Sequence, residues 1–395
     1  MKSFRAILLA LPAVLALPAV IERSVTSASV PGSWVVQLED NAILSVVLDT
    51  VRTLTGIEPT STFSIGGSRG FSFDGDDAVV SLLSTLGALK RIEPDYIVEA
   101  SAPAGQLQDR ALVSQSSSTW GLSRISSRSR GTSGYVYDNT AGQGTFVYVI
   151  DTGVNSGHND FGGRAIQGAN FISGESIADG NGHGTHCSGT VGGNVYGVAK
   201  RTTIIGVKTL SNAGRGTSSS TLQGLDWALN DARRRGISRS VFSMSLGGTF
   251  SQISNDAVAE AVRAGVFVAV AAGNNNQNAA NYSPASEPTA CTVGATDIND
   301  NRSSFSNFGS IVDIFAPGTD VPSTWIGSNT ATRTISGTSM ACPHVAGLAA
   351  YLIALEGTRS PAALCQRIQG LSTRNVIANA GSGSPDLLAY NGNGR

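Results

Sequence analysis

Three separate motifs contain side chains suited to acid, base and nucleophilic chemistry. Asp151 lies in VIDTG, His183 in GNGHGTHCSG and Ser339 in SGTSMACPHVAG. A serine hydroxyl is a weak nucleophile near neutral pH, so it needs a base to remove its proton. Imidazole can take that proton and return it, and a carboxylate can hold the ring and stabilise its charged form. In chain order, Asp151, His183 and Ser339 could supply these three roles.

Each motif also has a simpler interpretation when it is taken alone. An aspartate at the end of a strand often forms a turn, and Ser339 could merely cap the helix that follows it. His183, His186 and Cys187 could be metal ligands, but the zinc-hydrolase helix motif needs a glutamate that is missing here. In favour of catalysis, the helix start at Ser339 directs N–H groups and partial positive charge toward an oxyanion.

The elements around the motifs predict an α/β domain with a doubly wound, mostly parallel sheet. Continuous apolar runs are typical of strands buried on both faces, and four are found here, at 145–150, 203–207, 241–244 and 266–270. Helical patterns at 222–235 and 254–264 fit crossover connections that cover both faces of the sheet. Functional groups of such sheets gather beyond the carboxyl ends of the strands.

An earlier segment, about 33–100, predicts a small α+β unit with ferredoxin-like order β-α-β-β-α-β. The expected strands are 34–38, a segment around Phe63, 71–73 and 96–98. The expected helices are 42–54 and one capped by Asp76 that runs through Leu86. The polar stretch 101–119 follows and is typical of an exposed linker.

Composition and charge narrow the function further. The chain has 395 residues, 47 glycines and a formal net charge of −1, which offers no basic field for nucleic acid. Lys2 and Arg5 precede an apolar run, 6–21, that is typical of a secretion signal and short for a membrane span. We expect a secreted product without a membrane partner. Asn281 and Asn301 are then candidate glycosylation sites.

Taken together, the motifs resemble those of subtilisin-like serine endopeptidases, in particular the secreted fungal proteinase K-like branch. The resemblance implies a signal peptide over 1–20, a propeptide over 21–112 and a catalytic domain over 113–395. It implies that the propeptide assists folding, inhibits transiently and is removed by self-processing, with the junction expected between Asp109 and Ser114. It also implies a monomer that acts on proteins and peptides through an acyl-enzyme.

The resemblance assigns further site residues. It implies that Asn274 and the Ser339 backbone N–H form the oxyanion hole. A substrate would insert as a strand between two backbone edges, with a small uncharged pocket for large apolar or aromatic P1 residues and otherwise broad specificity. The implied substrate-binding residues are Gly214, Arg215, Gly216, Ser245, Leu246, Gly247, Ala271 and Gly273. Ser218 stands where relatives often carry an aromatic residue, so no preference at the fourth subsite is inferred.

One structural calcium site and one disulfide are implied by the same resemblance, and no catalytic metal. Asp313 would bind calcium with the carbonyl oxygens of Pro288 and Ala290. Cys291 would pair with Cys365. Cys187 is expected to remain a free thiol facing His183, and Cys342 to be a small buried residue.

Three other functions fit the sequence less well. A secreted binding protein or inhibitor on the same scaffold would not need the intact set of Asp151, His183, Ser339 and Asn274. A serine esterase would show a Gly-x-Ser-x-Gly elbow and another triad order, neither of which is found around Ser339. A zinc hydrolase would lose its activity at once with a chelator.

Overall fold

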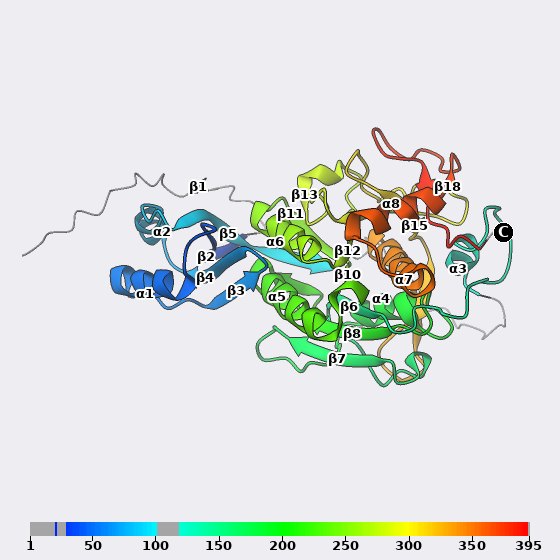
Figure 1. The fold of residues 1–395 in the computed structure, drawn as a ribbon, viewed down its shortest axis with the longest axis horizontal. Coiled ribbons are helices and arrows are strands. Elements are labelled where there is room, and N and C mark those ends of the chain that lie inside the picture. Colours follow the sequence, from blue (N-terminus) through cyan, green and yellow to red (C-terminus); the bar gives the residue numbers. More distant parts are fainter. Residues whose placement is uncertain (1–19, 22–28, 101–117, 394–395) are drawn as a thin grey trace, which may run out of the picture.

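The computed structural model describes residues 20–21, 29–100 and 118–393, with backbone alone at 98–100. Two units follow each other along the chain, a small sheet with two helices and a larger α/β domain (Figure 1). The expected signal peptide and most of the expected linker lie outside the described residues.

The small unit has the predicted ferredoxin-like order. Its elements are β2 (Ser29–Leu38), α1 (Leu44–Thr55), β3 (Ser61–Ile65), β4 (Ser68–Asp74), α2 (Asp77–Leu83) and β5 (Leu89–Ala100). The strands form an antiparallel sheet in the order β5-β2-β4-β3, and the short β1 (Val20–Ile21) pairs in parallel with β5. Asp76 caps α2 as predicted, but the helix ends at Leu83, three residues early. Strand β5 is much longer than the predicted 96–98.

The large unit is built on a nine-stranded sheet with the order β18-β19-β15-β14-β12-β10-β6-β8-β7. All neighbouring pairs are parallel except β18 with β19. The sheet strands are β6 (Phe146–Asp151), β7 (Ala165–Asn170), β8 (Thr203–Lys208), β10 (Ser240–Met244), β12 (Phe267–Ala271), β14 (Cys291–Thr296), β15 (Ile314–Pro317), β18 (Thr373–Arg374) and β19 (Leu387–Leu388). The helices are α3 (Trp120–Arg124), α4 (His183–Gly192), α5 (Ser218–Arg235), α6 (Gln252–Arg263), α7 (Thr338–Glu356) and α8 (Pro361–Leu371).

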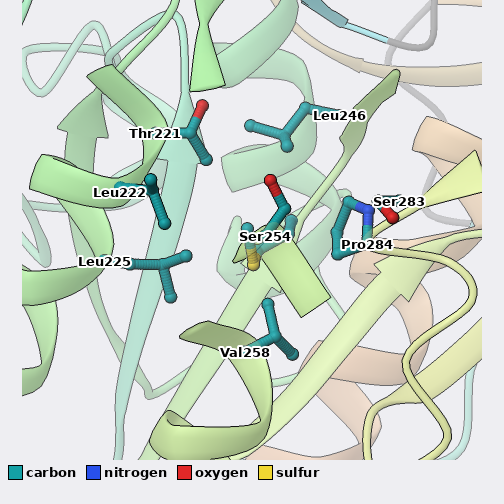
Figure 2. Close-up of a pocket in the computed structure, with 9 residues that line it drawn as sticks. Thr221, Leu222, Leu225, Leu246, Ser254, Val258, Ser283 and Pro284 are labelled. Carbon is teal, nitrogen blue, oxygen red and sulfur yellow. The ribbon is translucent and has the colours of Figure 1, made fainter. Parts of the chain in front are cut away.

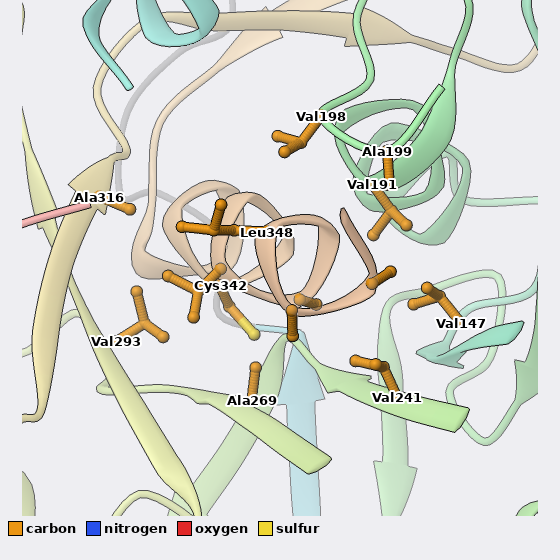
Figure 3. Packing of buried hydrophobic residues seen from close by; sticks show 14 of the residues in the cluster. Val147, Val191, Val198, Ala199, Val241, Ala269, Val293, Ala316, Cys342 and Leu348 are labelled. Carbon is orange, nitrogen blue, oxygen red and sulfur yellow. The ribbon is translucent and has the colours of Figure 1, made fainter. Parts of the chain in front are cut away.

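Alternation of side chains along β6 shows how the sheet is buried on both faces. Val147 and Val149 belong to the cluster that contains α4 and α7, whereas Tyr148 and Ile150 belong to the cluster that contains α5 and α6. Figure 3 shows the first cluster, with strand residues such as Val147 around the central helix. The doubly wound architecture is therefore as predicted.

Helix α7 is the core of this domain. It is long and apolar enough to cross a membrane, but 89% of its most apolar 18-residue window is buried inside the protein. Such burial on all sides is expected for the central helix of a large soluble core. The helix begins at Thr338, so Ser339 lies in its first turn, at the start of the apolar helix as predicted.

The small unit lies against the large one through its sheet and through β5. Val35, Phe63 and Ile65 join the apolar cluster of α5 and α6. Beyond the small sheet, β5 continues between β9 (Arg215–Thr217) and β11 (Leu246–Thr249), pairing antiparallel with both. Strand β11 also pairs with β13 (Tyr282–Ser283), and a hairpin, β16 (Val321–Thr324) and β17 (Thr332–Ile335), packs beside α4.

Candidate active site

Asp151 and His183 meet at the carboxyl end of β6 and the start of α4. The Nδ1 atom of His183 lies 2.8 and 2.9 Å from the two carboxylate oxygens of Asp151. Both side chains are buried, with exposures of 3% for His183 and 0% for Asp151. A proton on Nδ1 satisfies these contacts and leaves Nε2 as an acceptor. The Nε2 atom is buried and has no hydrogen-bond partner in the described part of the chain.

The electrostatics of His183 follow from this contact. Burial alone would lower the pKa of the imidazole, but the negative charge and the hydrogen bond of Asp151 raise the pKa well above its usual value. Burial raises the pKa of the Cys187 thiol, so Cys187 remains neutral near neutral pH. The site therefore contains a buried imidazole whose charged form is stabilised.

Ser339 lies in the first turn of α7, and its backbone carbonyl contacts Cys187, whose sulfur neighbours His183. Its hydroxyl donates to the carbonyl oxygen of Ser245 at 3.1 Å. Pro343 lies one turn deeper in the helix than expected, and it has no N–H to donate to the Ser339 carbonyl. That carbonyl instead accepts from Ser245 Oγ at 3.0 Å and from Cys187 Sγ at 3.4 Å. Because of the proline, the Ser339 carbonyl can accept from Ser245 and Cys187, and these contacts hold the start of α7 in place.

Asn274 lies three residues beyond β12, next to the start of α7. Its amide oxygen accepts from the backbone N–H and the hydroxyl of Thr338, at 2.9 and 2.8 Å. The amide NH2 group is therefore turned away from Thr338. Asn307, which the sequence did not single out, shapes this loop by donating to Ala272 and accepting from the backbone N–H groups of residues 275 and 277.

Asp179 is a second residue that the sequence analysis missed. Its buried carboxylate accepts from Thr152 Oγ1 at 2.8 Å and from the backbone N–H and hydroxyl of Thr185 at 2.9 and 2.6 Å. Two further backbone N–H groups, of residues 181 and 182, donate to it at 2.9 Å. Thr152 also accepts from the N–H of Gly184. Asp179 therefore ties the residue after Asp151 to the first turn of the helix that carries His183.

The predicted substrate edges are brought together on either side of β5. On β9, Gly216 pairs with Val98 and Arg215 with Glu99, and on β11, Gly247 pairs with Glu99 and Leu246 with Ala100. A strand of this chain itself therefore runs between the two edges predicted for a substrate. Gly214 precedes β9 with φ of +75°, in a turn that favours glycine.

A small pocket opens beside this cleft. It has a volume of about 20 Å³ and is lined by Thr221, Leu222, Leu225, Met244, Leu246, Ser254, Val258, Ser283 and Pro284. Figure 2 shows side chains of α5, α6 and β11 converging on it. Ser218 does not line this pocket, and its hydroxyl donates to Asp95 of β5 at 2.5 Å.

The residues predicted for the first subsite lie at the end of β12. Ala271 is the last residue of that strand and is buried, and Gly273 follows with φ of +100°. The N–H of Gly273 donates to Thr338 Oγ1, so this segment is bound to the start of α7. A Cβ at Gly273 would lie 2.4 Å from Asn307, which explains the requirement for glycine.

The cysteines take the roles that the resemblance implied. Cys291 and Cys365 form a disulfide, and Cys187 and Cys342 are buried free thiols. The sulfur of Cys187 lies 3.9 Å from His183 Nδ1.

The geometry does not support the metal-ligand interpretation of the second motif. The Nε2 atom of His186 lies 2.9 Å from the Val321 carbonyl oxygen, and His186 does not belong to the group of potential ligands around His183. Burial lowers the pKa of His186 to about 3, which suits a neutral structural ring. Asp151, His183 and Cys187 do place one potential ligand atom each within 4.8 Å of one another. The Nδ1 atom of His183, however, is already bonded to Asp151.

The residues predicted for calcium lie at the start of β14 and before β15. One Asp313 oxygen accepts from the N–H of Thr292 at 2.8 Å, and the other accepts from Gln369 at 3.2 Å. Burial raises the pKa of Asp313 to about 6. Each oxygen keeps a second acceptor direction, so the donor set remains compatible with a hard cation. Ala290 is buried and Pro288 is exposed.

Comparisons with known proteins agree with this geometry. Residues 142–394 match the Subtilase family, Peptidase_S8. Subtilisin-like serine protease AsES of Sarocladium strictum is 49% identical over 362 residues, covering 91% of this chain and 89% of that protein. The cuticle-degrading protease of Metarhizium anisopliae is 46% identical over 397 residues, covering 98% and 99%.

A solved structure gives the same result for the fold. A cold adapted subtilisin-like serine proteinase matches with a TM-score of 0.66 and 44% identity, covering 69% of this chain and 98% of that one. The predicted fold class is confirmed. Because the family match spans more than half of the chain and both relatives align along most of their length, this protein belongs to the subtilase family and is a serine endopeptidase.

Proposed function

We propose that Asp151, His183 and Ser339 form the catalytic triad of this endopeptidase. The observation that carries the proposal is the double contact of His183 Nδ1 with Asp151 at 2.8 and 2.9 Å. It selects the tautomer in which Nε2 can accept a proton from the nucleophile. Ser339 would first turn its hydroxyl from the Ser245 carbonyl toward Nε2.

The reaction then follows from the roles of these groups. Ser339 Oγ attacks the carbonyl carbon while its proton passes to His183 Nε2, and the Asp151 carboxylate stabilises the imidazolium. The Ser339 N–H and the Asn274 amide would donate to the developing oxyanion. As the C–N bond breaks, Nε2 returns the proton to the leaving amine, and water releases the acyl group by the same route.

Alanine variants test the triad directly. We expect Ser339→Ala and His183→Ala to lower kcat for a peptide substrate by about 10⁶, a loss of the size known for subtilisin. Ser336→Ala is the matched control, because Ser336 accepts from the N–H of Asp320 and touches none of the triad. Wild-type turnover in Ser339→Ala would contradict the proposal.

We also propose that the small unit is a propeptide whose last strand blocks the cleft until the enzyme cuts it. Strands β5 and β11 are antiparallel, and Leu246 stands opposite Ala100. The residue before Leu246 therefore stands opposite the residue after Ala100. Ser245, whose carbonyl lies 3.1 Å from Ser339 Oγ, is therefore opposite the next position of a strand bound in this register. This supports cleavage of the Ser101–Ala102 bond, upstream of the interval Asp109–Ser114 expected from the family resemblance.

Mass spectrometry of the secreted protein tests this processing. We expect a mature chain that begins at Ala102, or at a residue exposed by later trimming, and a released fragment that ends at Ser101. Ser339→Ala should remain one uncut chain when it is purified alone. A first cut between 109 and 114 would contradict the register argument, and normal cutting of Ser339→Ala would contradict self-processing.

Substrate recognition is proposed to be broad because it relies on the backbone edges of β9 and β11. The small, uncharged segment from Ala271 to Gly273 suits a large apolar or aromatic residue before the cleaved bond. The pocket between α5 and α6, being mostly apolar, suits a further apolar residue upstream. A peptide library read by mass spectrometry would measure both preferences.

We propose one structural calcium ion at Asp313, with the carbonyl oxygens of Pro288 and Ala290. Calcium would compensate a buried carboxylate that otherwise titrates near pH 6. A chelator should lower the Tm by several degrees at pH 8 while activity at 25 °C persists, because the ion would bind the folded state alone. The effect should shrink at pH 5, where Asp313 is protonated. An equal chelator effect in Asp313→Asn would contradict this site.

We propose that the protein is secreted, because its first residues have the pattern of a secretion signal, and that it can then be glycosylated. Asn281 is exposed, whereas the amide of Asn301 donates to Asp297 at 2.9 Å. We therefore expect any glycan to occupy Asn281 in preference to Asn301. Glycopeptide mapping of the secreted protein measures the occupancy of each.

A further inference from the structure

Two arginines lie at the amino ends of strands in the large sheet, the end opposite the candidate active site. Phe146 of β6 stands opposite both Thr203 of β8 and Ser240 of β10, so these three parallel strands begin side by side. Arg201 precedes β8 by two residues, and Arg239 immediately precedes β10. The two arginines therefore flank the start of β6.

Contacts place both of these side chains beside the loop that leads into β6. The Nη1 atom of Arg201 donates to the carbonyl oxygen of Asn139 at 3.1 Å. The Nη1 atom of Arg239 lies 3.6 Å from the position that a Cβ would take on Gly144. Both arginines are exposed, and within the part of the chain that the structure describes the guanidinium of Arg239 has no hydrogen-bond or ionic partner.

The end of helix α5 adds two more arginines to this edge of the sheet. Arg234 and Arg235 both bind the carboxylate of Asp231, at 2.9 and 2.6 Å. The guanidinium of Arg235 also lies 5.7 Å from the centre of the Phe146 ring, at the start of β6. The side chains of Arg234 and Arg235 are 66% and 37% exposed. One aspartate shared by two arginines leaves a net positive charge at this place.

Two neighbouring carboxylates neutralise only part of the charge of the four arginines. Asp231 is buried, and it also accepts from the hydroxyl of Tyr148 at 2.8 Å. Asp138, in the loop before β6, is exposed and accepts from the N–H of Thr140. The two carboxylates balance at most two of the four guanidinium charges, although the whole chain has a formal net charge of −1. The positive charge is therefore local to this edge, where it can attract a polyanion.

We propose that this arginine edge, made of Arg201, Arg234, Arg235 and Arg239, binds an acidic polysaccharide. Guanidinium groups donate pairs of hydrogen bonds to planar or charged oxygen groups such as carboxylates, and a row of them suits a chain that repeats its negative charges. Adjacent strands lie about 4.8 Å apart, so Arg201 and Arg239 are separated by about 10 Å at the backbone and can contact successive charged groups. A polysaccharide is favoured over nucleic acid because the protein is proposed to be secreted.

Binding at the arginine edge leaves the cleft open to a peptide. Asp151 is the last residue of β6, and Phe146 is the first, so about 16 Å of strand separates them at a rise of about 3.3 Å per residue. A bound polysaccharide would therefore hold the protease on an acidic matrix without competing with its substrate. Because exposed charges carry the interaction, its affinity should fall as the salt concentration rises.

Heparin, a sulfated polysaccharide, and polygalacturonate, a carboxylated one, test the inference by calorimetric titration of the purified enzyme at low salt. We expect both to bind the wild type, about threefold more weakly to Arg239→Gln and about tenfold more weakly to Arg239→Glu. One exposed charge contact changes affinity by up to about fivefold, and like charges repel by a similar amount. Arg374→Gln, which removes one positive charge from the outermost strand β18, should bind like the wild type.

Hydrolysis of a short peptide separates this binding from the active site. Both Arg239 variants should keep the wild-type kcat/KM, because Arg239 lies at the opposite end of the sheet and loses no partner when it is replaced. Equal affinities of the wild type and Arg239→Glu for both polysaccharides would overturn the role of the arginine edge. Tighter binding of single-stranded DNA than of either polysaccharide would overturn the choice of partner. Absence of peptide hydrolysis in the wild type would contradict the proposed function and leave the binding result intact.

Discussion

The Nδ1 atom of His183 contacts both carboxylate oxygens of Asp151, and this contact makes the ring more basic. The Asp151 charge outweighs the burial that would otherwise favour neutral imidazole, so the pKa of His183 is raised. A general base must be neutral to act, and a higher pKa makes it a stronger base but delays its availability to higher pH. His183 can therefore act as a general base only above its raised pKa.

The pH dependence of kcat/KM tests this electrostatic argument. Activity should rise with pH through an apparent pKa above 6.5, because His183 must lose its proton first. In Asp151→Asn the acid limb of the residual activity should shift to lower pH, because the carboxylate that raises the pKa of His183 is gone. An acid limb at or below pH 6.5 in the wild type would contradict the argument.

Asn274 offers a second test at the scale of one residue. Its amide oxygen is held by Thr338, so Asn274→Ala removes the NH2 donor. Because Asn274 is a proposed oxyanion-hole donor, we expect kcat to fall by about 10²–10³ with little change in KM, a loss of the size known for an oxyanion-hole donor of subtilisin. Asn276→Ala, in the same loop, is the control. A large rise in KM with kcat intact would indicate a role in substrate binding instead.

The Asp151–His183 contact and the positions of Ser339 and Asn274 at the start of α7 could be anticipated, because each residue stands in a recognisable motif at a strand end or helix start. Asp179 and Asn307 could not be singled out, because isolated Asp and Asn residues in loops are common turn formers. Only the folded chain shows that Asp179 accepts from Thr152 and Thr185 and that Asn307 shapes the Asn274 loop.

At the scale of elements, helix α4 depends on Asp179 for its start. Its N-cap residue, Gly182, has no side chain to bond the first N–H groups, and Asp179 takes that role from outside the helix. The same carboxylate holds the loop after β6, so it sets the approach of His183 to Asp151.

We expect Asp179→Asn to lower kcat about tenfold and to leave KM nearly unchanged, because Asp179 touches neither β9 nor β11. It should also cost about 1–3 kcal/mol of unfolding free energy, since an NH2 group would face buried donors. Asp160→Asn, at the other end of α4, is the matched control for stability because Asp160 accepts from the N–H of Val195. Equal kcat losses in both variants would argue against a positioning role for Asp179.

Element boundaries were harder to predict than the elements themselves. Helix α5 begins at Ser218, four residues before the apolar pattern, because Thr217 and Ser220 form a capping box within a polar run that resembles a loop. Strand β5 extends to Ala100 because its last residues pair with β9 and β11. Such long-range pairing leaves no periodic signal in the local sequence.

At the scale of the whole molecule, the two units are joined by polar contacts as well as by the apolar cluster. Asp95 accepts from the Ser219 N–H and both serine hydroxyls at the start of α5, and Glu93 accepts from Ser251, which caps α6. Both carboxylates are buried. Acidic groups at helix N-termini are favoured by the N–H groups and the helix dipole.

The strength of the proposed propeptide block should therefore depend on Asp95. We expect Asp95→Asn to shorten the delay between self-cleavage and full activity about tenfold, because charged hydrogen bonds of this kind contribute about 1.5–3 kcal/mol. The delay is measured by following peptide hydrolysis after the chain is secreted and purified. Asp49→Asn, on the exposed face of α1, should keep the wild-type delay. An unchanged delay in Asp95→Asn would show that the apolar cluster alone holds the two units together.

A fluorophosphonate probe tests the central claim most directly. Such a reagent phosphonylates a serine only where a base removes the hydroxyl proton beside an oxyanion site. After activation, peptide mapping should find one adduct per molecule on Ser339, with none in Ser339→Ala and little in His183→Ala. An adduct on another residue, or undiminished peptide hydrolysis by a chain that carries no adduct at Ser339 after exhaustive treatment, would contradict the account.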